Sequence, residues 1–120
     1  MDVIKDFMST PVLSVYVHTT VEEAAKVIEE KNVSCLLVKE NEDPVGLVTT
    51  TDLVKRVMAR GLDPKTTNVH SVMSKPLITM NHYLTRSDAN EIMQKNKIKH
   101  LAVTESNRVV GILTPKDMIG

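Results

Sequence analysis

The chain is poor in the residues that most often support redox or metal chemistry. Its 120 residues include one cysteine and no tryptophan, with two tyrosines and one phenylalanine as the other aromatic residues. A single cysteine cannot form an intramolecular disulfide, and Cys35 lies in an apolar run, so we interpret it as a small core residue. The four histidines are dispersed, without an i,i+4 pair or a nearby cysteine or carboxylate cluster. The sequence therefore predicts no metal site.

An excess of charge of one sign is also absent. Lysine plus arginine and aspartate plus glutamate each number 15, and no run of basic residues occurs. Binders of nucleic acid or of a membrane surface usually carry such a basic patch, so neither is an expected partner. No stretch approaches about 18 consecutive apolar residues, and no signal peptide is recognisable, so we expect a cytoplasmic protein.

What the chain does contain is an internal repeat. Residues 4–55 align with residues 69–120 without a gap, with 12 identities in 52 pairs. Both copies carry Met-Ser-x-Pro, at residues 8–11 and 73–76. Both also carry Gly-h-h-Thr-x-x-Asp (h is apolar), at residues 46–52 and 111–117. The repeat predicts two equivalent half-structures related by a pseudo-two-fold axis, with clefts between them. Each half, of roughly 55 residues, is too small to be stable alone, so we expect the halves to share one core.

Each copy predicts the element order β–α–β–β–α. The first helices begin at Thr-x-x-acidic capping boxes, Thr20–Glu23 and Thr85–Asp88, and end near Asn32 and Lys97. The apolar strands that follow are predicted at residues 34–39, 45–49, 100–104 and 109–113. The segments before the first helices, residues 11–15 and 76–80, are predicted to be extended.

A second helix of the first copy is predicted to begin at Thr49 and to end at Gly61. The second copy stops at Gly120, where its last helix is expected to begin, so we expect that helix to be either truncated or supplied differently. We divide the chain into a first repeat (1–60), a linker (61–68) and a second repeat (69–120). The fold class is α/β of the α+β kind, with two β-α-β-β-α repeats.

The Gly-h-h-Thr-x-x-Asp motif is the strongest candidate for chemistry. It lies where a strand ends and a helix begins, a place suited to a phosphate or another polar ligand. The aspartate can accept both hydroxyls of a ribose, and the threonine hydroxyl can hold the same sugar or a phosphate oxygen. The same residues also fit a helix N-cap with an acidic third residue, with Pro115 at the first helical position. The two roles are compatible, and both remain open at this point.

These features together resemble the cystathionine-β-synthase (CBS) domain family, as a tandem pair known as a Bateman module. The resemblance covers nearly the whole chain and rests on the doubled Met-Ser-x-Pro and Gly-h-h-Thr-x-x-Asp motifs. It implies a regulatory, non-catalytic module that requires no cofactor. Such modules bind AMP, ADP, ATP or a similar adenosine compound in clefts between the repeats. It also implies a homodimer and an effector protein or a further domain on which the module acts.

The resemblance also implies two sets of ligand-binding residues. In each cleft the Thr-x-x-Asp of one repeat holds the sugar, and the extended segment of the other repeat lines the base. The preferred cleft would comprise Thr114 and Asp117 on the sugar, Lys99 and His100 near the phosphate, and Pro11, Val12, Ser14 and Val33 around the base. The second cleft would comprise Thr49, Asp52, Leu77, Thr79 and Ile98.

The two clefts are expected to differ in affinity for a nucleotide. Ser34 and Cys35 stand in the second cleft where Lys99 and His100 stand in the first. A phosphate without a cation loses charge-assisted hydrogen bonds worth about 1.5–3 kcal/mol each. The alternative for Lys99 is a solvated strand-end lysine, and for His100 a histidine at the edge of the core. Leu37 and Ala102 replace prolines common in the family, and the base would lie among aliphatic side chains.

Two other functions are compatible with the same residues. In the first, the protein is a ligand-free dimerisation scaffold whose Thr-x-x-Asp residues only cap helices. In the second, the sensed ligand is S-adenosylmethionine or a related adenosyl compound. An enzyme is not expected, because no nucleophile–base arrangement, metal cluster or pair of catalytic carboxylates is recognisable.

Overall fold

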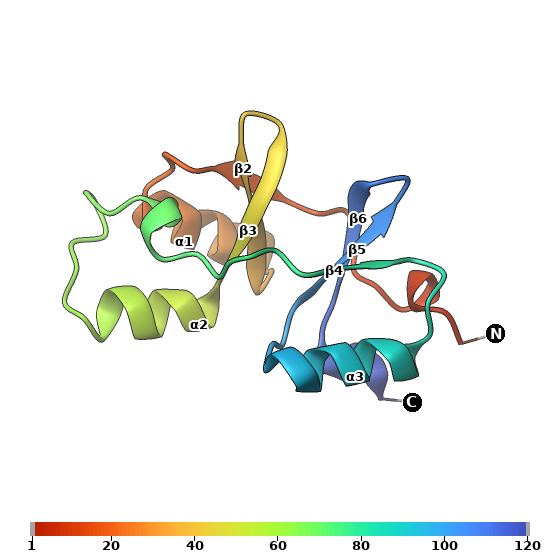
Figure 1. The fold of residues 1–120 in the computed structure, drawn as a ribbon. Coiled ribbons are helices and arrows are strands. Elements are labelled where there is room, and N and C mark those ends of the chain that lie inside the picture. Colours follow the sequence, from red (N-terminus) through yellow and green to blue (C-terminus); the bar gives the residue numbers. More distant parts are fainter. Residues whose placement is uncertain (1, 120) are drawn as a thin grey trace. The chain divides into compact units, whose positions relative to one another are not determined.

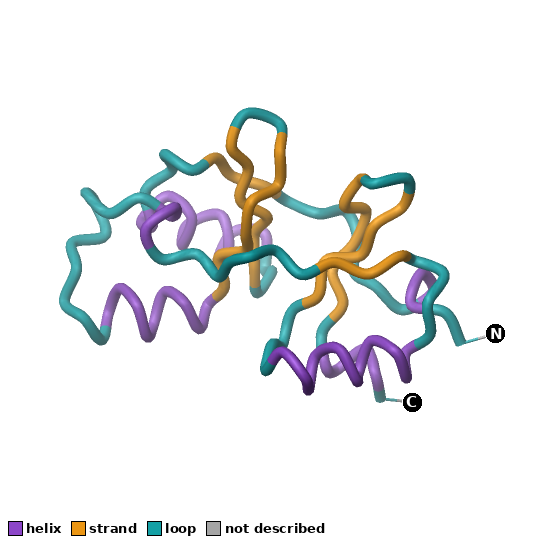
Figure 2. Tube along the Cα trace, viewed as in Figure 1, coloured by secondary structure: helices purple, strands orange, loops and turns teal. Residues whose placement is uncertain are grey.

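The computed structural model describes residues 2–119, which fold into alternating strands and helices (Figures 1 and 2). The strands and α-helices are β1 (Ser14–Tyr16), α1 (Val21–Lys31), β2 (Cys35–Glu40), β3 (Asp43–Thr49), α2 (Thr50–Asp52), β4 (Thr79–Asn81), α3 (Arg86–Asn96), β5 (Leu101–Glu105) and β6 (Arg108–Leu113). The α2 helix continues directly into a π-helical segment, Leu53–Met58. Short 3₁₀ turns at Ile4–Asp6 and Val69–Ser71 precede β1 and β4, and Pro115–Met118 follows β6.

The chain forms two compact units that do not coincide with the two sequence repeats. The central unit is Leu13–Leu77, and the terminal unit combines Met1–Val12 with Ile78–Gly120. Each unit therefore contains the strands and helices of one repeat together with the Met-Ser-x-Pro segment of the other. This exchange could not be derived from the repeat alone, because an alignment shows which segments are equivalent but not which ones pack together.

Each unit contains one three-stranded mixed sheet. In the central unit β1 pairs with β2 in parallel and β2 pairs with β3 antiparallel, with Leu36 opposite Val48. The terminal unit repeats this order with β4, β5 and β6, with Ala102 opposite Ile112. Both hairpins have a register shift at the same place, after Val38 and after Val103. The predicted strands are confirmed, each with bounds within two residues of the expected ones.

The first helix of each repeat begins and ends where the sequence predicts. At α1 the Glu23 N–H donates to Thr20 Oγ1 at 3.2 Å, and Asn32 ends the helix in the left-handed conformation at φ 52°. Of the two bonds of the predicted Thr20–Glu23 capping box, only this one is present in the described structure. At α3 both bonds between Thr85 and Asp88 form. The side chain of Glu23 is longer than that of Asp88, so its carboxylate can extend into solvent and accept hydrogen bonds from water instead.

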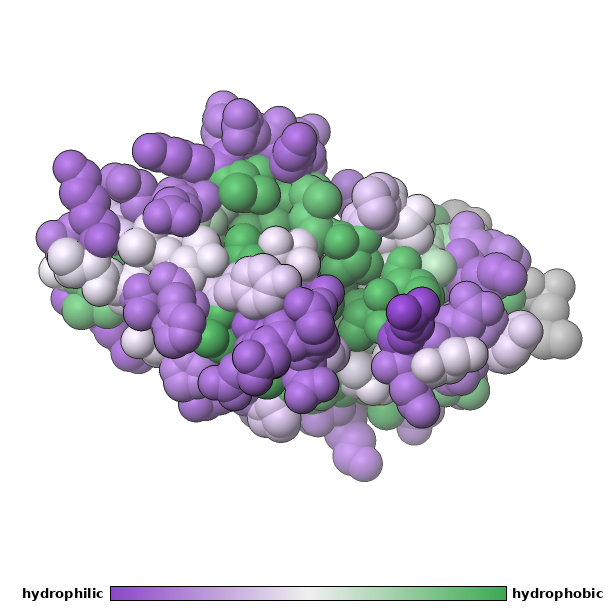
Figure 3. All heavy atoms as spheres, turned by 90° about the horizontal axis from the view of Figure 1, so that it is seen from above, coloured by the Kyte–Doolittle hydropathy of each residue, from purple (hydrophilic) through white to green (hydrophobic). Residues whose placement is uncertain are grey.

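The buried apolar residues form two clusters, so the expectation of one shared core is wrong. The central cluster includes Leu36, Val38 and Val48 together with Val69, Val72 and Met73 from the second sequence copy. The terminal cluster includes Leu101, Val103 and Leu113 together with Ile4 from the first copy. Neither half completes its core alone, since each takes apolar residues from the other copy. The surface drawn in Figure 3 shows many hydrophilic side chains, with apolar ones exposed among them.

Candidate functional site

The two repeated motifs pair with each other inside each unit. In the terminal unit the Ser9 N–H donates to the Ile112 carbonyl at 2.8 Å, and the Ile112 N–H donates back at 3.1 Å. In the central unit Ser74 and Leu47 exchange the same two bonds, at 2.7 and 3.1 Å. Met-Ser-x-Pro from one repeat thus forms an isolated antiparallel β-bridge with the Gly-h-h-Thr segment of the other.

The glycine of each motif allows this close approach. A Cβ at Gly46 would lie 2.7 Å from the Ser74 carbonyl oxygen and 2.8 Å from Met73 Sδ. A Cβ at Gly111 would overlap the Met8 side chain. A side chain at Gly46 would meet a backbone atom and push the Met73–Ser74 segment away from the sheet, whereas one at Gly111 would require the Met8 side chain to move. The glycine therefore fixes the position of the segment beside the Thr-x-x-Asp turn.

The central Thr49–Asp52 turn is a complete capping box at the start of α2. The Asp52 N–H donates to Thr49 Oγ1 at 3.1 Å, and the Thr49 N–H donates to Asp52 Oδ2 at 3.0 Å. Both residues are buried, and Asp52 is only 4% exposed. The capping interpretation of this motif is therefore confirmed for the central unit.

The Asp52 carboxylate has two further partners in the central unit. The Ser74 hydroxyl lies 3.0 Å from Oδ1 and 3.1 Å from Oδ2. The Arg56 Nε lies 3.7 Å from Oδ1, and Arg56 Nη1 donates to the carbonyls of Val72 and Met73 at 3.2 and 3.0 Å. Both carboxylate oxygens are thus engaged within the protein. Sequence reasoning missed both residues. Arg56 stands four residues after Asp52, a helical spacing that could have indicated the pair, whereas only the fold brings Ser74 to Asp52.

The Thr114–Asp117 turn in the terminal unit is less fully bonded. The Thr114 N–H donates to Asp117 Oδ2 at 2.8 Å, and the Thr114 hydroxyl lies 3.3 Å from the same oxygen. Both residues are half-buried. Within residues 2–119, no side chain other than that of Thr114 hydrogen-bonds the Asp117 carboxylate, and Oδ1 is left available.

Arg86 links three parts of the terminal unit around this turn. Its guanidinium contacts Asp2 Oδ1 through Nε and Nη2, both at 2.9 Å, and it lies 3.8 Å above the Phe7 ring. Its Nη1 also donates to the Asp117 backbone carbonyl at 3.3 Å. Arg86 aligns with the apolar Val21 of the first repeat, so this clamp exists in only one unit. No sequence motif marks Arg86. Asp2 and Phe7 are distant from it in the chain, and its third partner is the backbone carbonyl of Asp117.

The remaining predicted residues are divided between the units. In the terminal unit, Lys99 is exposed and His100 is half-buried just before β5, and this unit also contains Pro11, Val12, Thr79 and Ile98. In the central unit, Ser14 is exposed on β1 and Val33 is half-buried after α1, and this unit also contains Leu77. The terminal unit thus holds six of the eight residues predicted for the preferred site.

Other kinds of site find little support among the described residues. Within residues 2–119, no group of three or more His, Cys, Asp or Glu side chains is arranged to hold a metal ion. None of the helices described in that range has the length and apolarity needed to span a membrane. Cys35 is buried, as predicted, and burial raises the pKa of its thiol from 9.0 to about 11. The reactive thiolate is therefore scarce at neutral pH.

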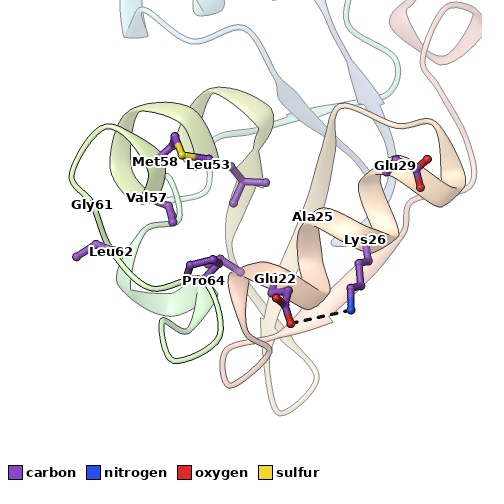
Figure 4. Close-up of a pocket in the computed structure, with 11 residues that line it drawn as sticks. Glu22, Ala25, Lys26, Glu29, Leu53, Val57, Met58, Gly61, Leu62 and Pro64 are labelled. Atoms are coloured by element: carbon purple, nitrogen blue, oxygen red, sulfur yellow. Dashed lines mark ion pairs between the residues drawn. The ribbon is translucent and has the colours of Figure 1, made fainter.

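The central unit also has an apolar groove of about 540 Å³ between two helices (Figure 4). Val21 and Ala25 of α1 line one wall, and Leu53, Val57 and Met58 line the other. Glu22 and Lys26, an ion pair at 4.0 Å, lie on the α1 side. Met58 is 78% exposed, which is unusual for a large apolar side chain. We name this feature the helix groove.

Comparisons with known proteins agree with this fold. The family described as CBS domain matches residues 4–59 and 69–120. The CBS domain-containing protein YhcV of Bacillus subtilis is 33% identical over 118 residues, which are 98% of this chain and 84% of that protein. Inosine-5'-monophosphate dehydrogenase of Methanocaldococcus jannaschii is 33% identical over 119 residues, which are 98% of this chain but 22% of the dehydrogenase.

A solved structure extends the comparison to three dimensions. A hexameric CBS-CP12 protein from bloom-forming cyanobacteria matches with a TM-score of 0.91 at 30% identity, over 98% of this chain and 69% of that chain. The predicted α+β fold with two repeats is thereby confirmed, and self-association is known among similar proteins.

Proposed function

Because the chain belongs to the CBS domain family and carries two copies in tandem, we propose that it is a non-catalytic regulatory module that binds an adenosine-containing nucleotide. CBS pairs are commonly regulatory and ligand-binding. The chain covers 84% of the Bacillus relative, so that protein has little length left for a separate catalytic domain. The regulated target would be another protein or a further domain.

The open carboxylate of Asp117 is the observation that carries this proposal. Asp117 Oδ1 has no partner among the described side chains and can accept a ligand hydroxyl; the capping Asp88 has an equally open Oδ1, but only Asp117 stands in a Gly-h-h-Thr-x-x-Asp motif. A ribose presents two adjacent hydroxyls that such an oxygen can accept. Lys99 supplies an exposed cation in the same unit for a phosphate group.

The ligand prediction is tested by thermal unfolding with AMP, ADP, ATP, S-adenosylmethionine and GTP in turn. A ligand at about 100 times its dissociation constant stabilises the folded state by about 2.7 kcal/mol, which raises the Tm by several degrees. We expect this rise with adenosine compounds, and we expect Asp117→Ala to abolish it.

Asp88→Ala is the matched control for this experiment. Asp88 caps α3 in the same unit with the same chemistry but belongs to no predicted site. It should lower the Tm slightly and leave the ligand-induced rise intact. If no compound raises the Tm of the wild type, the ligand-free scaffold is the better description. A rise confined to S-adenosylmethionine would replace the nucleotide by an adenosyl ligand.

The helix groove supports a second part of the proposal, that the protein is a homodimer associated through this face. Met58 and Val54 are 78% and 61% exposed on the helix that forms one wall. Large exposed apolar side chains beside a groove are typical of association surfaces. The hexameric relative shows that similar proteins do associate.

This association predicts that Met58→Glu converts the dimer to a monomer. A carboxylate placed in an apolar interface must be desolvated, so we expect at least a tenfold loss of dimer affinity. Light scattering after size exclusion over a range of protein concentrations measures this loss. Ala59→Glu adds the same charge one residue away, outside the groove lining, and should leave the dimer intact. A wild-type monomer at all concentrations would rule out the homodimer.

A further inference from the structure

The two Thr-x-x-Asp turns differ in a way that their identical motifs conceal. We propose that Ser74 and Arg56 close the Thr49–Asp52 turn to sugar ligands, so that each chain offers one adenosine site, at Thr114–Asp117, and not two. This inference rests on the proposed function and makes it more specific. It assigns two residues outside the Thr-x-x-Asp turns the role of deciding how many ligands bind.

The Asp52 carboxylate has no room for a ribose diol. Its two oxygens share the single proton of the Ser74 hydroxyl, whose oxygen lies 3.0 and 3.1 Å from them. Oδ2 also accepts from the Thr49 N–H at 3.0 Å, and Oδ1 faces Arg56 Nε at 3.7 Å. A diol would therefore compete with the Ser74 hydroxyl, which lies against both carboxylate oxygens.

Burial makes that displacement unfavourable. Asp52 is 4% exposed, so a ligand hydroxyl could reach it only if Ser74 moved away. Ser74 is fixed by its two backbone bonds to Leu47 and by the close approach of its carbonyl to Gly46. Arg56 is anchored in turn by the carbonyls of Val72 and Met73, immediately before Ser74. The closing residues therefore hold one another in place.

The terminal unit offers an internal comparison. Ser9 aligns with Ser74 and makes the same backbone bridge, to Ile112. Its side chain is exposed, and the described structure contains no hydrogen bond from its hydroxyl to Asp117. The same motif therefore places a serine hydroxyl on the aspartate in one unit and not in the other, among the described residues.

A different cause could also reduce binding at the central turn. Ser34 and Cys35 stand where Lys99 and His100 stand in the other repeat, so the cations that would hold a phosphate are missing. The two causes act on different parts of the ligand, because Ser74 blocks the sugar and the missing cations affect only a phosphate. Adenosine, which has no phosphate, separates them.

The test is isothermal titration of the full chain with AMP and with adenosine, each as a separate probe. We expect about one equivalent of either compound per wild-type chain. Ser74→Ala removes the hydroxyl shared by the two Asp52 oxygens and should raise the stoichiometry to about two equivalents of adenosine. Adding Asp52→Asn to Ser74→Ala should remove the second equivalent.

Ser9→Ala is the matched control, because it removes the aligned hydroxyl where no closing bond exists; it should leave one equivalent. Arg56→Met is the second opening variant and covers the case in which Ser74→Ala does not fold. If the folded opening variants still bind one equivalent, or if the wild type binds two of adenosine, the closure is wrong while the proposed function stands. If neither the wild type nor any variant binds either probe, the proposed function fails and the closure with it.

Discussion

Replacing Gly46 by alanine is expected to destabilise the central unit by about 3 kcal/mol or more. The new Cβ would lie 2.7 Å from the Ser74 carbonyl oxygen and 2.8 Å from Met73 Sδ. Overpacking of this kind usually costs about 1–3 kcal/mol, and a clash with a backbone atom belongs at the upper end because the backbone cannot change rotamer. Urea unfolding of both proteins measures the difference in the free energy of unfolding.

Gly61→Ala is the control, since it adds the same methyl group where no atom lies within 4 Å. Gly61 has φ +66°, so alanine there should cost only the strain of the left-handed region, about 1–2 kcal/mol. If Gly46→Ala cost less than Gly61→Ala, the segment containing Met73 and Ser74 would not be packed against β3 as the structure shows.

The second large effect is expected for Asp52→Ala, at about 3 kcal/mol. The substitution removes the acceptor of the Thr49 N–H and of the Ser74 hydroxyl, and it leaves Arg56 without its carboxylate. Hydrogen bonds to a charged group contribute about 1.5–3 kcal/mol each, and buried donors left unpaired add to the loss. Arg56 is 43% exposed on its side chain, so water can replace part of its ion pair.

Asp88→Ala separates this network from ordinary helix capping. Asp88 accepts from the Thr85 N–H at 3.2 Å in a capping box that is exposed to solvent. Its loss should cost about 0.5–1 kcal/mol, the lower part of the usual range for a cap. Equal losses for Asp52→Ala and Asp88→Ala would mean that Ser74 and Arg56 add nothing to the central turn. The free energies of unfolding of the wild type, Asp52→Ala and Asp88→Ala, measured with urea in the same buffer, decide between the two results.

Much of the local structure could be predicted from the sequence, because it depends on neighbours in the chain. The helices begin at Thr20 and Thr85 and end at left-handed Asn32 and Lys97, as capping chemistry requires. The paired strands follow from short apolar runs interrupted by polar turns. The doubled Met-Ser-x-Pro and Gly-h-h-Thr-x-x-Asp motifs resemble those of the CBS domain family, and the family match confirms this resemblance.

The candidate site was predictable only in part. Thr114 and Asp117 are close because they are three residues apart, and the sequence shows that directly. Ser14 and Val33 lie in the central unit, whereas the other six residues predicted for the preferred cleft lie in the terminal unit. This division depends on how the chain partitions into units, which no local pattern encodes. The expected core failed for the same reason, since Ile4 and Val69 pack in the unit of the opposite repeat.

The sequence by itself determined the repeat, the order of its elements and the two Thr-x-x-Asp turns, because these depend on contacts over three or four residues. Only the tertiary structure decided that the turns are unequal. Ser74 reaches Asp52 across 22 positions, whereas the aligned Ser9 makes no such bond to Asp117 within the described residues. Identical motifs can therefore have different partners, since the carboxylate's environment is supplied by segments that the chain brings from elsewhere.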